Sequence, residues 1–203
     1  HGQRARLDRP LDFLVIADHA NGLGSMDALV KGNEKLLEDE RLVEWRRLLT
    51  EVGGAKAGLQ ISEEGRMVGW PDALNDPAIV GSAWKEVILA AERHNDPGNF
   101  TAFIGYEWTS WPGGSNLHRV VIYRDGADKL ERVIPFSSFM SSDPEDLWSA
   151  LGHYEETTGG RVLAIPHNGN LSNGLMFRTA TFEGGALNED YAKKRARWEP
   201  LVE

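Results

Sequence analysis

Five side chains that commonly bind metal ions lie beside four short apolar runs in this sequence. Asp18 and His19 end the first run, Glu107 ends the second, His118 precedes the third and His167 follows the fourth. Imidazole nitrogens and carboxylate oxygens suit Zn, Mn, Fe or Mg. A carboxylate directly after a buried strand must pair with a cation or face a wet cleft. The pattern therefore predicts a divalent metal site where the strands end.

Each of these residues also has a structural interpretation. Asp18 could cap the turn that follows it, and a lone histidine near a strand end is more often hydrogen-bonded than a ligand. The segment from Asn21 to Gly24 lacks the Lys-Ser/Thr ending of a phosphate-binding loop, so it predicts only a turn. The recurrence of the pattern at four strand ends is what favours the metal site.

The elements expected to position these residues are strands of a parallel sheet. The apolar runs show no alternation and are too short for independent helices, which is typical of strands buried on both faces. The predicted strands span residues 13–17, 100–106, 120–123 and 162–166, with a short edge strand at 132–136. Amphipathic patterns predict helices over 36–52, 84–91, 143–154 and 187–203. This order predicts a single α/β domain with a mostly parallel sheet, outer helices and an irregular insertion at about 55–80.

Composition limits the classes of partner. The 203 residues carry a formal net charge of −9, which argues against broad binding of nucleic acid or anionic lipid. The chain has no cysteine, which excludes disulfides and thiolate metal ligands. No apolar run is long enough to span a membrane, so we expect a soluble protein, cytoplasmic or periplasmic. The opening segment from His1 to Arg6 resembles no signal peptide, and its lack of an initiator Met suggests a piece of a longer chain.

The order of these motifs resembles the PHP (polymerase and histidinol phosphatase) superfamily, within it the branch catalogued as domain of unknown function 3604. The resemblance covers most of residues 8–178 and implies an incomplete, distorted (β/α)7 barrel with metal ions at the carboxyl ends of its strands. It implies His19, Glu107, His118 and His167 as ligands, with Glu107 bridging two metals. Asp18 would not bind the metal itself but would orient the His19 ring that does. The implied activity is phosphoester hydrolysis by a two-metal mechanism on a small-molecule substrate.

The resemblance also shapes the remaining expectations. Side chains that could hold substrate oxygens, water or phosphate are Asn116, Arg119, Asn168, Asn170 and Arg178. For the two arginines, a solvated surface position is the simpler interpretation. The superfamily's His-x-His motif on the first strand and its final Asp-x-His motif are missing, and His1 does not replace them. We therefore expect a fragment with weak or absent turnover.

Two other classes of function remain open. Trp108 and Trp111 border the predicted site, and aromatic platforms suit a sugar or an aryl ester. This favours, as the alternative, a non-catalytic module that binds carbohydrate or another small ligand. Ser110 or Ser115 could serve as a nucleophile, although neither lies in a Gly-x-Ser-x-Gly elbow.

Overall fold

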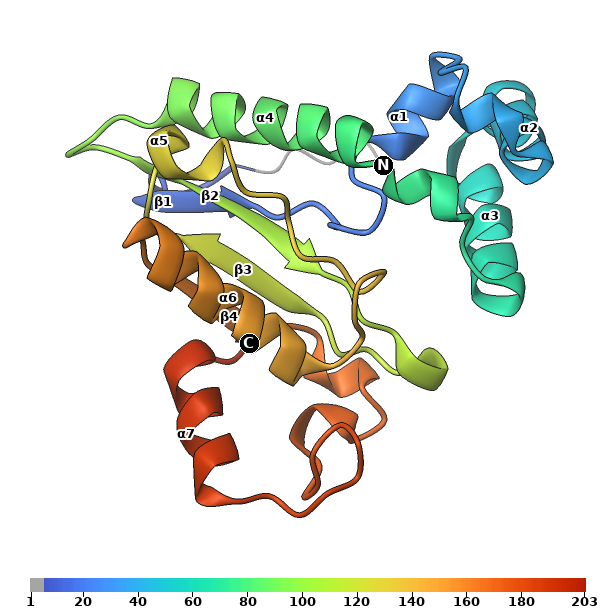
Figure 1. The fold of residues 1–203 in the computed structure, drawn as a ribbon. Helices are drawn as coiled ribbons and strands as arrows, with labels where there is room; N and C mark the ends of the chain where they lie inside the picture. The colour runs from blue at the N-terminus through green and yellow to red at the C-terminus, as the bar shows by residue number, and fades with distance from the viewer. Residues whose placement is uncertain (1–5) are drawn as a thin grey trace.

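The computed structural model describes residues 6–203, so His1 and its neighbours to residue 5 lie outside the described part. Its centre is a sheet of four strands in the order β1-β2-β3-β4. The first two strands are parallel, and the remaining neighbours are antiparallel (Figure 1). The strands are β1 Phe13–Ile16, β2 Thr101–Trp108, β3 Arg119–Tyr123 and β4 Val162–Pro166.

This open, mixed sheet shows that the expected parallel (β/α)7 barrel is wrong. Residues 109–118, which join β2 to β3, are too few for the crossover that parallel neighbours require, so β3 returns antiparallel. β1 is an edge strand and is not buried on both faces, contrary to the prediction from its apolar sequence. Phe13 and Ile16 are 62% and 61% exposed. Residues 132–136 belong to no strand of the described sheet.

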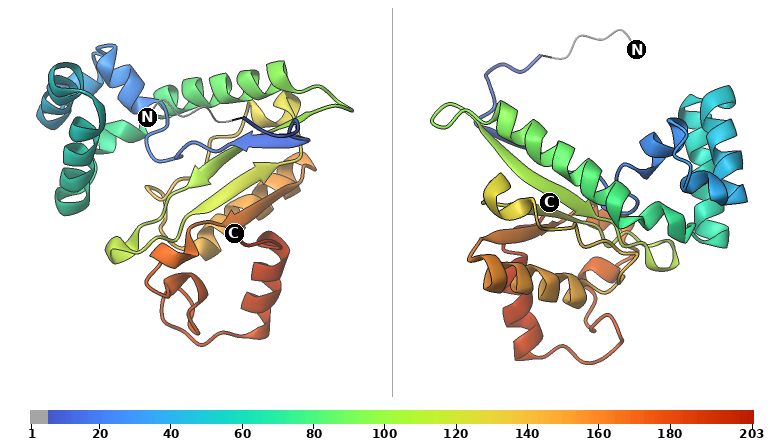
Figure 2. Two further views of the ribbon diagram at one scale, coloured as in Figure 1. Left: turned by 180° about the vertical axis from the view of Figure 1, so that it is seen from behind. Right: turned by 45° about the horizontal axis from the view of Figure 1, so that its top comes forward.

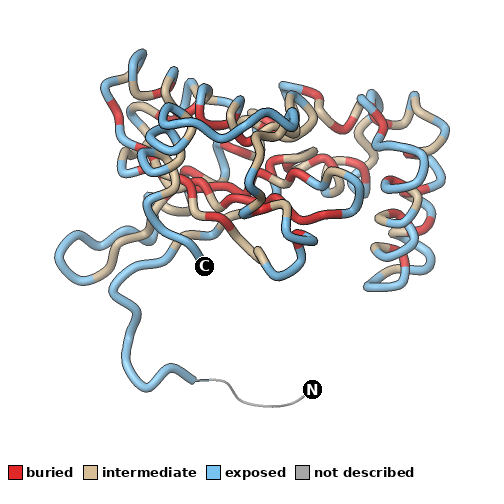
Figure 3. Tube along the Cα trace, turned by 90° about the horizontal axis from the view of Figure 1, so that it is seen from below, coloured by how far each residue is buried: buried red, intermediate tan, exposed pale blue. Residues whose placement is uncertain are grey.

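Helices α4 and α6 cover one face of the sheet. Seen from behind, the strands lie in front of α6, and α4 runs along the top of the view (Figure 2). The main core joins Trp84 and Ile88 of α4 to Tyr106, Val121 and other strand residues, and Leu147 and Leu151 of α6 complete it. Buried residues accordingly follow the strands and the inner sides of the helices (Figure 3). The helices are α1 Ser25–Val30, α2 Glu40–Arg47, α3 Gly54–Val68, α4 Pro77–His94, α5 Ala127–Leu130, α6 Pro144–Thr158 and α7 Glu189–Trp198.

A second, smaller core holds α1, α2 and α3 together at one end of the sheet. It contains Leu29, Leu42, Trp45 and Ile61. The predicted helix over 36–52 is divided, because Asp39 caps a new helix by accepting hydrogen bonds from the backbone of Arg41 and Leu42. Residues 55–80, expected to be irregular, are largely helical.

Two helices begin at strong caps, and the sequence predicted only the start of α6; it placed the helix that became α4 over 84–91. Asp143 accepts a hydrogen bond from the backbone N–H of Glu145, and Pro144 occupies the first turn of α6. Asp76 caps α4 in the same way, also with a proline in the first turn. Among residues 6–203, no helix is long and apolar enough to cross a membrane.

Candidate metal centre

The four predicted ligands meet at one edge of the sheet. β4 is antiparallel to β3 and β3 to β2, so the carboxyl ends of β2 and β4 and the amino end of β3 share that edge. The chain after β1 continues the hydrogen bonding to β2 as far as this edge. The backbone N–H of Glu107 donates to Asp18 O, and that of Ala20 donates to Glu107 O, both at 2.8 Å. His118, which enters β3, therefore reaches the same place as His167, which leaves β4.

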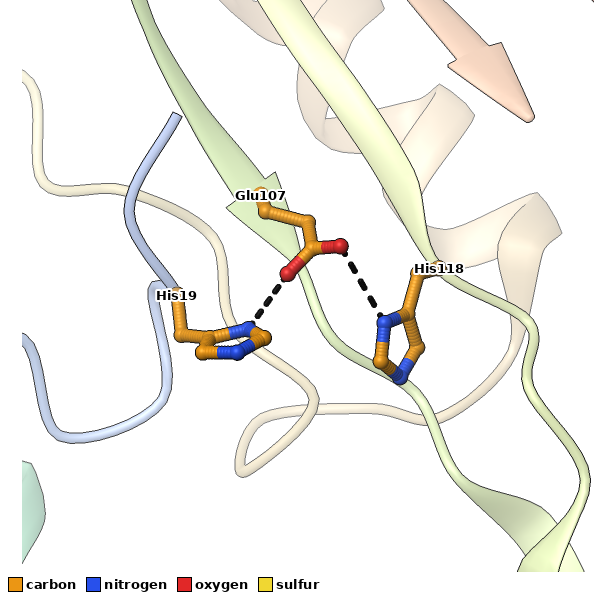
Figure 4. Close-up of side chains that lie close together, drawn as sticks. All are labelled: His19, Glu107 and His118. Atoms are coloured by element: carbon orange, nitrogen blue, oxygen red, sulfur yellow. Dashed lines mark hydrogen bonds and ion pairs between the residues drawn. The ribbon is translucent and has the colours of Figure 1, made fainter. Parts of the chain in front are cut away.

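Glu107 is the centre of the cluster (Figure 4). Its Oε1 lies 3.1 Å from His118 Nδ1 and 3.5 Å from His167 Nε2. Its Oε2 contacts His19 Nδ1. Ligand atoms of His19, Glu107 and His118 all lie within 4.8 Å of one another. Three imidazoles thus surround one carboxylate, an arrangement that suits a divalent cation.

Charge pairing within the cluster shifts two pKa values in opposite directions. Burial would raise the pKa of Glu107, but hydrogen bonds from His118 and His19 outweigh it and lower the pKa to about 2. The hydrogen bond to Glu107 raises the pKa of His19 against a smaller effect of burial. Glu107 is therefore an anion at neutral pH, as a metal ligand must be.

His118 supplies the test of whether these residues fit a metal. The residue is 6% exposed, and its Nε2 has no hydrogen-bond partner within the described chain. A buried imidazole nitrogen without a partner is costly. Asn116 Oδ1 accepts a hydrogen bond from the backbone N–H of His118 at 3.0 Å, which holds this segment in place. The donor types and the unsatisfied nitrogen both fit a cation.

His167 is held by a carboxylate that sequence reasoning missed. Its Nδ1 contacts Glu203 Oε2, which also accepts a hydrogen bond of 3.0 Å from the backbone N–H of Asn168. The Asn168 amide nitrogen lies 2.8 Å from His167 Nε2. These contacts assign the proton to Nδ1 and make Nε2 an acceptor, whose lone pair takes a hydrogen bond from the Asn168 amide that His167 would give up on binding a metal. Glu203 lies 36 residues from His167, so no local pattern indicated the pair.

The residue beside His19 is Thr109, and not Asp18 as expected. Thr109 Oγ1 lies 2.6 Å from His19 Nδ1 and donates to Glu107 Oε2 at 3.2 Å. The carboxylate of Asp18 makes no hydrogen bond with any described residue, and the residue acts through its backbone oxygen. Thr109 follows Glu107 by two positions, so strand alternation could have indicated it.

The cluster opens into a cavity of about 550 Å³. Asn116 and Asn168, whose amides we expect to bind oxygen atoms, both line it. Trp111 and Leu171 line it as well and are 38% and 52% exposed. Trp108, in contrast, is completely buried in the core, so of the two predicted aromatic platforms only Trp111 faces the site.

The structure places the other predicted substrate residues elsewhere. Arg119 is 2% exposed, and its Nε donates to Glu199 Oε1 at 2.9 Å, so this guanidinium is committed to a buried ion pair. Arg178 donates to the backbone oxygens of Ala180 and Thr181, away from the cavity. Asn170 is exposed on the short turn Gly169–Leu171.

The two candidate serine nucleophiles are occupied. The Ser110 hydroxyl donates to Ser142 O at 2.8 Å and is completely buried. Ser115 accepts a hydrogen bond from the Asn173 amide at 3.1 Å. Within the described chain, no histidine contacts either hydroxyl. Neither serine is therefore activated by a base, as a catalytic serine must be.

A second cavity, of about 590 Å³, lies on the helix-covered face between β2, β3 and α6. Tyr106, Tyr123 and Tyr154 line it, and burial raises the pKa of all three hydroxyls. The Tyr154 hydroxyl donates to Asp125 at 2.9 Å. This cavity is separate from the four predicted ligands.

Comparison with known proteins bears on the resemblance proposed above. Neither the curated proteins nor the solved structures include a match to this chain. The expected membership of the PHP superfamily is wrong: no comparison links the chain to it, and the sheet is open and mixed. A family model described as "Protein of unknown function (DUF3604)" matches residues 1–203, and the chain belongs to that family.

Proposed function

We propose that the protein is a divalent-metal-dependent hydrolase of small phosphoesters. One observation carries the proposal: Glu107, held ionised, has both carboxylate oxygens in contact with imidazoles, those of His19, His118 and His167. His19, Glu107 and His118, whose ligand atoms lie within 4.8 Å of one another, offer one anionic and two neutral donors, and His167 adjoins them; this set matches Zn, Mn or Fe better than Mg or Ca.

The chain's own residues define what the site would do. A bound cation supplies Lewis acidity, which polarises a phosphoryl oxygen and lowers the pKa of water. Glu107, His19, His118 and His167 would hold it, and Glu203 would fix the ring of His167. The open cavity admits water and an ester, and Asn116 and Asn168 offer amide groups to its oxygens.

Metal binding is the first test. Purified protein is dialysed against EDTA and titrated calorimetrically with Zn²⁺ and with Mn²⁺. We expect saturable binding by the wild type and its loss in Glu107→Gln, which keeps the shape of the side chain but removes the charge. The matched control is Glu156→Gln, an exposed glutamate on α6. Heat changes equal to buffer, or equal binding by Glu107→Gln, would contradict the metal site.

Hydrolysis is tested on the metal-loaded protein. We expect release of inorganic phosphate from phenyl phosphate that stops with EDTA and returns with the metal. If the protein binds metal but releases no phosphate from any ester, the metal site is retained and the proposed hydrolase activity is rejected.

Trp111 favours one second candidate, a non-catalytic module for carbohydrate or another organic ligand. Its exposed ring lines the cavity, as in many sugar sites. Ligand binding by the EDTA-treated protein, without any bound metal, would favour this candidate over the hydrolase.

A further inference from the structure

The residues that line the cavity of the candidate metal centre are of two chemical kinds. Glu107 and three histidines are ionisable, whereas Trp111, Leu171 and Val120 are apolar. Trp111 lies close to the cluster, with its ring centroid 5.3 Å from that of His118 and the rings tilted by 54°. A flat group resting on Trp111 would thus extend directly from the metal ligands.

The apolar side chains that line the cavity are partly exposed to solvent, and a purely polar substrate would not cover them. Trp111 and Leu171 are 38% and 52% exposed although they flank a polar cluster. The other tryptophan near the site, Trp108, is completely buried. The cavity of about 550 Å³ also falls within the range of sites for organic ligands and exceeds the needs of an inorganic phosphate ion.

We propose that the substrate is a phosphoester whose organic part carries a ring with an apolar face, which stacks on Trp111 beside Leu171. This inference rests on the proposed hydrolase and names its substrate class. In the reaction, water forms the new bond to phosphorus, the bond from phosphorus to the ester oxygen breaks, and the departing oxygen takes a proton from water. The products are inorganic phosphate and the ring-bearing alcohol.

Aromatic rings and pyranose rings share this chemistry, so the kinetic test uses both. The metal-loaded protein is assayed with phenyl phosphate, glucose 6-phosphate and glycerol 3-phosphate, which has no ring. We expect Trp111→Ala to lower kcat/KM for phenyl phosphate about tenfold relative to glycerol 3-phosphate, with most of the change in KM. Trp111→Phe should restore most of it. If Trp111→Ala lowers kcat/KM for glucose 6-phosphate to the same extent, the substrate class includes pyranoses. If it does not, the class is restricted to esters with an aromatic ring.

The control is Trp70→Ala. Trp70 has nearly the same exposure, 39%, but packs against Trp45 in the lobe of α2 and α3. Its substitution should change the three substrates alike. Equal effects of Trp111→Ala on all three esters, or none, would overturn the proposal.

A binding measurement separates failure of this inference from failure of the hydrolase. Phenylphosphonate, whose carbon–phosphorus bond is not hydrolysed, is titrated into the metal-loaded protein while tryptophan fluorescence is followed. We expect quenching in the wild type and in Trp70→Ala, and its loss in Trp111→Ala. Quenching through Trp111 without turnover of any ester would retain the ring site and reject the hydrolase. Unchanged quenching in Trp111→Ala would overturn the ring site, whatever the turnover.

Discussion

At the scale of single residues, the site depends on contacts between side chains that are distant in sequence. Glu203 accepts hydrogen bonds from the His167 ring and from the backbone of Asn168. The backbone N–H of Asn168 and then the His167 ring lower the pKa of Glu203, which keeps it ionised at neutral pH. A carboxylate behind a ligating imidazole fixes both the ring and its tautomer.

We therefore expect Glu203→Gln to weaken Zn²⁺ binding by about ten- to a hundredfold, because it removes the charge that orients His167. Calorimetric titration measures the affinity. NMR of the His167 ring nitrogens should show the Nδ1–H tautomer in the wild type and a mixture in the variant. Glu156→Gln should change neither quantity. Wild-type affinity and an unchanged tautomer in Glu203→Gln would show that Glu203 has no such role.

The sequence identified the residues of the candidate metal centre better than it identified the residues that hold them in place. His19, Glu107 and His167 stand directly after apolar runs, and this local signal suffices to place them at a sheet edge. Arg119 has an equally suggestive position beside His118, but its partner Glu199 lies 80 residues away, and the ion pair could not be inferred locally. A surface arginine and a buried, paired one look alike in sequence.

At the scale of elements, the Arg119–Glu199 pair joins the end of α7 to the sheet. Both side chains are almost completely buried, at 2% and 1% exposure. Glu199 also accepts a hydrogen bond from the Trp148 indole of α6 at 2.9 Å and lies 3.2 Å from Arg195. Three elements are therefore tied by one carboxylate.

Removing that carboxylate should leave the buried charge of Arg119 without an ionic partner, with only the Leu117 backbone oxygen to accept from its Nη1. We expect Glu199→Ala to lower the free energy of unfolding by about 3–5 kcal/mol, measured by urea denaturation. On the same helix, Glu189 forms an exposed pair with Lys193, and Glu189→Ala should cost less than about 1 kcal/mol. A loss below about 1 kcal/mol in Glu199→Ala would show that the buried pair does not hold α7.

The strands were predicted well in position and poorly in direction. The four apolar runs at 13–17, 100–106, 120–123 and 162–166 became strands, whereas the edge strand expected at 132–136 did not form. The sequence contains no direct signal for the antiparallel return of β3 apart from the short connection before it. Helix α3 was missed because glycines precede and interrupt its apolar residues, including Gly53 and Gly54, both with positive φ. Those glycines turn the chain between two helices, and their number suggested a loop.

Gly105 shows how closely the strands approach. A Cβ there would lie 2.5 Å from Val121 O of β3 and 2.6 Å from Val15 of β1. We expect Gly105→Ala to cost about 1–3 kcal/mol, because the backbone oxygen cannot move without disturbing β3. The same substitution at Gly58 of α3 meets open space and should be neutral or stabilising by up to about 1 kcal/mol. Urea denaturation of both variants tests the contrast, and equal effects would contradict it.

At the scale of the whole molecule, one face of the sheet has no helix from residues 6–203 packed over it. The half-buried side chains of Phe103, Val120, Ile122 and Ile165 belong to the strand positions that alternate with the buried core positions. The candidate metal centre lies at the end of this face, since Glu107 and His118 share its alternation. The candidate ligands belong to segments that are held together mainly by the hydrogen bonds of the sheet.

A cation bound there would connect the chain after β1, the end of β2, the start of β3 and the end of β4. Binding to the folded state alone stabilises it by about 2.7 kcal/mol at a free metal concentration of one hundred times Kd. For a protein of this size that corresponds to a rise in Tm of roughly 5–10 °C. We expect this rise on adding Zn²⁺ to EDTA-treated wild type, measured by calorimetry. His118→Ala should lose most of the rise, whereas His153→Ala, at an exposed position on α6, should keep it. The comparison uses the rise in each variant and not its absolute Tm, because removing a buried side chain also lowers the stability of the metal-free protein. An equal rise in His118→Ala would show that the stabilising metal binds away from Glu107.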